Sequence, residues 1–515
     1  MRVHPTLSGT RRTPAILLGV ASIVVAACVA APQTRPPSTP STLPTTGVPT
    51  VTPSLTASPT ATPPIYCDDG PTAHTPMPAD CLIPSQALPS GFALPSFGLF
   101  ATKTPWPNPS SNLPKLAPWR GSQILGLGSG IQAYMIGIWP DGSLAVLQYW
   151  ITETGFSGSV LSIRPDGTPK PGWPVGGVPA PVGYGSQAMG GDGTVYVAAV
   201  DPGATQDTPT SIEVTAIGPD GKVLSGWPYA SPPALHDYAS GKLVIGPSGQ
   251  ACFMDYLPGQ PAQELNSPSA IYCVGADGKL LPGWPYTSYR PMDHPVFGPD
   301  GTLYVEQYMA DKPGSQEIVA LGSNGKPKPG WTPWTVPSLM VSPIAVAANG
   351  RVILMVMVLS GDELVILGPD GSLQSKAALP LPKPQDFHDM ATTVDGGLYL
   401  STMDDGELAM FGKTTGHISA FTRDGAAKHG WPVTVDGPNA IILSPDGSVW
   451  TTWEIWNADE RTGTAMAVFD SNGKLREGFP TETPDLGDLL VFDSSGTAYA
   501  IMNSTSGASV VKIPG

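Results

Sequence analysis

Several polar residues recur at one place along the chain, five to seven residues ahead of a Gly-containing turn. They include Asp293, His294, His388, Asp389 and Asp488. If the fold brings them together, imidazoles and carboxylates can bind a metal ion or act as a general acid and base. The alternative is a hydrated set of polar groups that bond only to water. The choice depends on the elements that hold these residues.

Aromatic residues form a second candidate group. Trp150, Trp453 and Trp456 lie in or near long segments between predicted strands. Indole rings beside a cleft stack on sugar rings or peptides, but the same rings also serve as packing between sheets, and both interpretations stay open. The chain carries no nucleophile elbow, P-loop, zinc-protease or EF-hand motif. We therefore assign no catalytic residue, no metal and no cofactor.

Two kinds of Gly turn mark the elements that position these residues. The first kind occurs eight times, 46 to 56 residues apart: Asp141-Gly142, Asp192-Gly193, Ser248-Gly249, Asp300-Gly301, Asn349-Gly350, Asp395-Gly396, Asp446-Gly447 and Ser495-Gly496. The second kind occurs seven times: Asp166-Gly167, Asp220-Gly221, Asp277-Gly278, Asn324-Gly325, Asp370-Gly371, Asp424-Gly425 and Asn472-Gly473. Asp-Gly and Asn-Gly supply the positive φ angles that tight hairpins need.

The runs beside these turns are predicted strands, such as 302–305 and 318–321. Four short strands in each of eight repeats predict an all-β chain, a single β-propeller of eight four-stranded blades. The eighth unit lacks a fourth strand, and we expect residues 97–106 to supply it. The tight turns should share one face, so the polar group above would ring the channel mouth on the other.

An aromatic residue follows most second turns. We expect these residues to pack between blades: Trp173, Trp227, Trp284, Trp331 and Trp431, with Phe479 in the seventh unit. The fifth unit lacks an aromatic residue at this place.

The first 120 residues differ in composition from the repeats. Residues 1–27 have a basic start and a short apolar run, typical of a signal peptide. Cys28 follows Ala26-Ala27, which resembles a bacterial lipobox; the alternative is cleavage after Ala30 or Ala31. Residues 28–64 form a Pro/Thr/Ser-rich tether that starts at the lipidated Cys28. We assign 65–120 as an irregular lead-in containing a disulfide and the ring-closing strand, and 121–515 as the propeller.

Four further cysteines suggest disulfides in an exported chain. Repeat alignment places Cys252 and Cys273 on neighbouring strands, at the positions of Tyr304 and Ala320 in the next unit. Cys67 and Cys81 would form the second pair, in the lead-in.

The charge balance restricts the partners. The formal net charge is −15, and removal of residues 1–27 takes away three Arg and no acid, which leaves −18. Such a chain disfavours nucleic acid and anionic lipid surfaces. We therefore expect a protein or glycan partner, and membrane attachment only through lipid on Cys28.

Units that combine Asp-Gly-Thr-Val-Tyr-Val, a long loop, and Gly-Pro-Asp-Gly-Lys before a Trp resemble the pyrroloquinoline-quinone-type propeller repeat. That family includes quinoprotein alcohol dehydrogenases and non-enzymatic lipoproteins of outer-membrane assembly. The chain lacks the adjacent Cys-Cys pair expected over the quinone. The resemblance favours an extracytoplasmic binding or scaffold lipoprotein on the outer face of a bacterial membrane. The alternatives are a quinone-dependent dehydrogenase and an envelope-glycan hydrolase or lyase that uses the channel.

Overall fold

Thirty-two β-strands make up the part of the chain that the structure describes, with no helix among those residues. The computed structural model describes residues 121–129, 131–152, 155–178, 186–200, 211–234, 242–257, 268–309, 315–337, 340–346, 350–357, 363–378, 385–392, 398–404, 415–422, 427–436, 440–457, 460–483, 490–493, 495–504 and 507–514. Within these ranges no helix could span a membrane.

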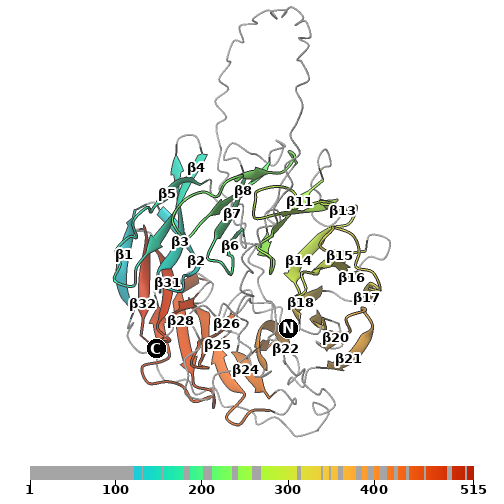
Figure 1. The fold of residues 1–515 in the computed structure, drawn as a ribbon. Coiled ribbons are helices and arrows are strands. Elements are labelled where there is room, and N and C mark those ends of the chain that lie inside the picture. Colours follow the sequence, from blue (N-terminus) through green and yellow to red (C-terminus); the bar gives the residue numbers. More distant parts are fainter. Residues whose placement is uncertain are drawn as a thin grey trace, which may run out of the picture. The chain divides into compact units, whose positions relative to one another are not determined.

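The strands form eight antiparallel four-stranded sheets, the blades of a propeller (Figure 1). Blade 1 contains β2 (Ile131–Ile138), β3 (Leu144–Thr152), β4 (Gly155–Ile163) and β5 (Val175–Val178). Blade 2 contains β6 (Gln187–Met189), β7 (Val195–Val200), β8 (Ile212–Ile217) and β9 (Tyr229–Ala230). Blade 3 contains β10 (Leu243–Ile245), β11 (Ala251–Tyr256), β12 (Ser269–Val274) and β13 (Tyr286–Ser288). Blade 4 contains β14 (Met292–Phe297), β15 (Leu303–Tyr308), β16 (Ser315–Leu321) and β17 (Trp334–Pro337).

The second half of the ring repeats this order. Blade 5 contains β18 (Met340–Val346), β19 (Val352–Met357), β20 (Glu363–Leu367) and β21 (Leu373–Ala378). Blade 6 contains β22 (Gln385–Thr392), β23 (Leu398–Asp404), β24 (Thr415–Phe421) and β25 (Val433–Asp436). Blade 7 contains β26 (Ala440–Leu443), β27 (Val449–Asn457), β28 (Glu460–Phe469) and β29 (Thr481–Thr483). Blade 8 contains β30 (Val491–Phe492), β31 (Ala498–Ser504), β32 (Gly507–Ile513) and β1 (Ser122–Gly128). The predicted eight-bladed fold is confirmed.

The predicted Gly turns join the first strand to the second, and the third to the fourth. The first-turn Gly142 and Gly301 have φ angles of 78° and 79°, a region that glycine enters without steric cost. Asp141 and Asp300 cap these turns, because each Oδ1 accepts the backbone N–H two residues later at 3.0 Å. Because the strands alternate in direction, both kinds of turn lie on one face of the ring. The loops between second and third strands, and between blades, lie on the other.

In most blades, a loop follows the second turn. We call it the rim loop and define it as the residues between the second turn and the fourth strand. Its aromatic residue packs between blades, as predicted. Trp227 of blade 2 belongs to a buried cluster with Tyr196 of its own blade and Phe253 and Val274 of blade 3. Backbone contact is equally close, since a Cβ added to Gly226 would lie 2.1 Å from the carbonyl oxygen of Asp277. The rim loop therefore needs glycine at this point.

An N-terminal strand closes the ring, but a different segment supplies it than we expected. The strand β1 pairs antiparallel with β32 and completes blade 8 (Figure 1). The predicted segment, 97–106, lies outside the described residues. The half-buried Ile124, Leu125 and Leu127 pack against the buried cluster between blades 8 and 1, so apolar burial selects this later segment. Only two residues separate β1 from β2, which makes the connection short.

Cys252 and Cys273 form a disulfide within blade 3. They face each other on β11 and β12, with their Cα atoms 4.1 Å apart. The next blade pairs Tyr304 with Ala320 at the same register, so the repeat alignment predicted this bond correctly. Cys28, Cys67 and Cys81 lie outside the described residues.

Candidate functional site

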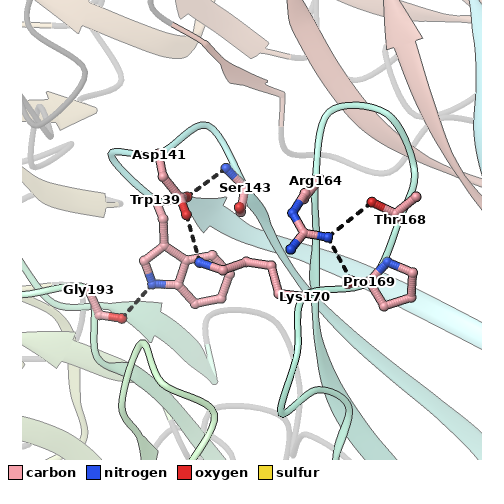
Figure 2. Close-up of polar contacts among 8 residues, drawn as sticks. All are labelled: Trp139, Asp141, Ser143, Arg164, Thr168, Pro169, Lys170 and Gly193. Carbon is pink, nitrogen blue, oxygen red and sulfur yellow. Dashed lines mark hydrogen bonds and ion pairs between the residues drawn. The ribbon is translucent and has the colours of Figure 1, made fainter.

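On the tight-turn face, the first-turn carboxylates of blades 1, 4 and 7 are bound to cations of their own blade. In blade 1, Asp141 Oδ2 accepts a hydrogen bond from Lys170 Nζ at 2.7 Å, and that ammonium lies 5.6 Å from the centre of the Trp139 ring (Figure 2). The Trp139 Nε1–H donates to the Gly193 carbonyl of blade 2 at 2.8 Å (Figure 2). The group therefore braces the turn and the neighbouring blade.

The lowered pKa values of these carboxyl groups indicate a structural role rather than a role in proton transfer. Burial alone would raise the pKa of Asp141, but hydrogen bonds from Lys170 and Ser143 lower it overall. At Asp300, burial alone would again raise the pKa, but hydrogen bonds from Thr302 and Lys328 lower it overall. A carboxyl group with a lowered pKa stays ionised at neutral pH and is a poor general acid.

On the opposite face, one predicted channel residue forms an ion pair between two blades. Asp293, at the start of β14, accepts a hydrogen bond from Lys242 Nζ, which directly precedes β10. The Lys242 and Asp293 side chains are 30% and 22% exposed, so both remain accessible to solvent. The sequence prediction did not include Lys242, although it lies within the same spacing ahead of its first turn, because lysine is not a typical metal ligand and a local pattern does not show that it pairs with Asp293 of the next blade.

A fully buried acidic residue lies opposite Asp293 on the neighbouring strand. Asp293 faces Glu306 across the β14–β15 ladder, and Glu306 is fully buried. Burial, followed by the nearby carboxylates of Glu306 and Asp293, raises the pKa of Tyr308 to about 12. The tyrosine is therefore a neutral hydrogen-bonding group at this end of blade 4.

A polar row braces the connection from blade 3 to blade 4. Arg290 donates to Glu317 Oε1 at 2.7 Å, and Gln307 Nε2 donates to the same oxygen at 2.8 Å. Tyr286 of blade 3 donates to Gln307 Oε1 at 3.3 Å. The braced connection presents Tyr289, a residue that is 82% exposed. Sequence patterns gave no signal for Tyr289, because nothing in the repeat marks an exposed aromatic residue.

The remaining channel candidates are placed by their backbone alone. His294 lies at a bulge of β14, between the pairs Asp293–Glu306 and Val296–Tyr304. His388 lies at a bulge of β22, and Asp389 pairs with Ser401. Bulges redirect side chains and are frequent beside functional sites.

Asp488 lies outside the described residues. Among the side chains that the structure does describe, no group of three or more His, Cys, Asp or Glu residues is arranged to hold a metal ion.

The aromatic candidates do not form one cleft. Trp453 is only 3% exposed and packs with blade 6 residues such as Trp431, so the prediction of a ligand-stacking role for it is wrong and the packing alternative holds. It faces blade 6 because side chains alternate along β27, where Trp450 takes the blade 8 side. Trp150 is half-buried on β3. Trp456 pairs with Arg461 in the ladder, and its side chain is not described.

No protein-family model and no curated sequence matches the chain. Prolyl oligopeptidase B from Galerina marginata is 10% identical with a TM-score of 0.43, over 74% of this chain and 56% of that one. The alignment thus spans little more than half of that enzyme.

Two further solved structures are similar at the same level. A quinoprotein alcohol dehydrogenase-like protein from Bacteroides thetaiotaomicron is 14% identical with a TM-score of 0.34, over 61% of this chain and 68% of that one. A gluconolactonase from Xanthomonas campestris is 15% identical with a TM-score of 0.27, over 79% and 97%.

Proposed function

We propose that the propeller is a non-catalytic binding or scaffold module, exported and lipid-anchored on the outer face of a bacterial membrane or envelope. The observation that carries the binding role is Tyr289, an exposed aromatic residue on a connection fixed by the Arg290–Glu317 ion pair. An aromatic ring held on a rigid support loses little conformational entropy on binding, which is typical of binding hot spots.

The groups around Tyr289 suit a neutral or basic ligand. Arg290 follows Tyr289 directly and forms a partly exposed ion pair with Glu317, and Lys242 and Asp293 add a charge pair at the channel side. The chain is strongly acidic, which disfavours polyanions. A protein segment or a neutral glycan of the envelope fits this surface.

Affinity capture from the native envelope tests the binding role. The full propeller should retain a specific ligand, and Tyr289→Ala should weaken retention at least tenfold, since hot-spot truncations cost roughly 2 kcal/mol or more. Val223→Ser is the matched control, because Val223 is also exposed but lies on the tight-turn face. Equal retention by both variants would exclude this surface as the binding site.

The anchor is a separate part of the proposal. It is supported by Cys28 directly after Ala26-Ala27 and by the Pro/Thr/Ser-rich tether that follows. More than one lipid chain on Cys28 would hold the protein firmly at a bilayer. Cys28→Ala should then move the protein to the soluble fraction with an unchanged propeller. If the variant stays with the membrane, and the parent protein carries no lipid, residues 1–27 act as an uncleaved anchor instead.

We also infer that the blades are of the pyrroloquinoline-quinone type without its redox chemistry. The Gly turns and the Trp after them support the repeat type, and the missing Cys-Cys pair argues against the dehydrogenase. An absorbance spectrum of the protein purified from its native envelope should lack a quinone band. A quinone band together with alcohol-dependent dye reduction would favour the dehydrogenase.

A further inference from the structure

The joint between blades 5 and 6 lacks a rim loop. In blade 1 the fourth strand begins at Val175, eight residues after Gly167, and in blade 3 it begins at Tyr286, eight after Gly278. In blade 5 it begins at Leu373, two residues after Gly371. Blade 5 therefore has no segment that can extend from its second turn to the next blade.

Rim loops of other blades form one or both of two contacts. The indole N–H donates to a carbonyl in the second turn of the next blade: Trp227 to Ala276 at 3.2 Å, Trp284 to Ser323 at 3.0 Å and Trp431 to Ser471 at 3.2 Å. The ring also packs edge-on against a tyrosine of its own blade: Tyr196–Trp227 at 5.6 Å, Tyr304–Trp331 at 5.2 Å and Tyr399–Trp431 at 5.2 Å. Such aromatic pairs stabilise packing beyond their buried area.

Blade 5 has neither the rim-loop tryptophan nor the tyrosine, and an aliphatic side chain stands in place of the tyrosine. Ile353 occupies the position of those tyrosines, three residues after Gly350, and is 2% exposed. The side chain fills its space, yet it can form neither the aromatic pair nor a hydrogen bond to blade 6. The Trp331 rim loop of blade 4 still contacts blade 5, where Thr332 N–H donates to the Asp370 carbonyl at 2.9 Å.

Blade 6 also turns polar side chains toward this joint. Ile418 and Ala420 pack toward blade 7, and side chains alternate along a strand, so His417 and Ser419 face blade 5. Both are buried, and His417 Nδ1 lies 3.3 Å from Thr434 Oγ1. Buried polar groups reduce the apolar area that the two blades can share.

We infer that the joint between blades 5 and 6 is the seam at which the closed ring opens. Opening at the joints that follow blades 2, 3 and 6 breaks an indole hydrogen bond to the next blade. Opening at the joint that follows blade 4 separates the Trp331 ring from the blade 5 residues of its buried cluster. Opening at the seam breaks neither. The ring can therefore widen at this joint while blades 1 to 4 stay packed against one another.

Hydrogen exchange of the full chain, followed by mass spectrometry, tests the seam. Amides of β20 should exchange at least about tenfold faster than those of β16, the third strand of blade 4, since local opening sets the rate. In low urea the β20 rate should change little, because a small opening exposes little surface, whereas the β16 rate should rise. Equal protection and equal urea dependence of β20 and β16 would overturn the inference.

A substitution tests the cause. Trp331→Ala removes the rim-loop ring from the joint between blades 4 and 5, and should raise exchange in β16 to the level of β20. Val223→Ser should leave both strands unchanged. If Trp331→Ala folds but leaves exchange in blades 4 and 5 unchanged, the rim loop does not set joint strength and the inference fails.

Discussion

At the scale of single residues, the first-turn carboxylates of blades 1, 4 and 7 combine a backbone cap with an ion pair. Asp446 in blade 7 accepts the Ser448 N–H at 3.0 Å and pairs with Arg476. Burial alone would raise the pKa of Asp446, but hydrogen bonds from Ser444, Arg476 and Ser448 lower it to about 2. An unfolded Asp has a pKa near 3.9. The ionised carboxylate therefore favours the folded state above about pH 4, and this contribution is lost as the pH falls toward 2.

Asp446→Asn should lower the free energy of unfolding at pH 7 by about 1 kcal/mol, a modest value because solvent screens a 43% exposed carboxylate. Urea unfolding at pH 7 and pH 2.5 measures the effect, and the gap between the two proteins should shrink at the lower pH. Asp277→Asn is the control, since Asp277 pairs with Lys279 at a more exposed position. A gap that stays constant with pH would mean that the charge contributes nothing.

The role of a residue could be predicted where the same position recurs in several repeats. The turn glycines and the Cys252–Cys273 bond follow from alignment of one unit with the next. Trp453 shows the limit, because its aromatic character suits a cleft and a core equally, and only the alternation along β27 decides between them. The contacts around Lys242 and Tyr289 depend on how blades 3 and 4 meet, which a local sequence pattern does not predict.

At the scale of elements, the rim loop is the device that joins one blade to the next. Trp227→Ala should lower the free energy of unfolding by about 3–5 kcal/mol, since it leaves a cavity between Tyr196 and blade 3. Trp227→Phe keeps a ring, as Phe479 does naturally in blade 7, and loses only the hydrogen bond to Ala276, worth about 1 kcal/mol. Guanidinium unfolding ranks the three proteins, and equal losses for the two variants would show that the indole N–H, not the ring, holds the joint.

At the scale of the whole molecule, eight turns at a regular spacing predicted the ring, but they did not locate its closing strand. The ladder of β1 with β32 is interrupted between Gln123 and Leu125 and again between Gly126 and Gly128. Two irregularities in seven residues remove the alternation that marks a strand, and no Gly turn precedes it. The need for a fourth strand was visible from the short eighth unit, whereas its identity depended on packing between the two ends of the propeller.

The last prediction concerns the closure of the ring by β1. A chain that starts at Gly121 keeps β1 and should fold as a monomer, with a melting temperature close to that of the full chain. A chain that starts at Ile131 leaves β32 as an open edge and exposes the buried cluster shared by blades 8 and 1, which includes Val510 and Met135. Open strand edges pair with other chains, so this protein should aggregate or melt at a much lower temperature. Size-exclusion chromatography and circular dichroism distinguish the two outcomes; equal behaviour of both chains would mean that the propeller does not need β1.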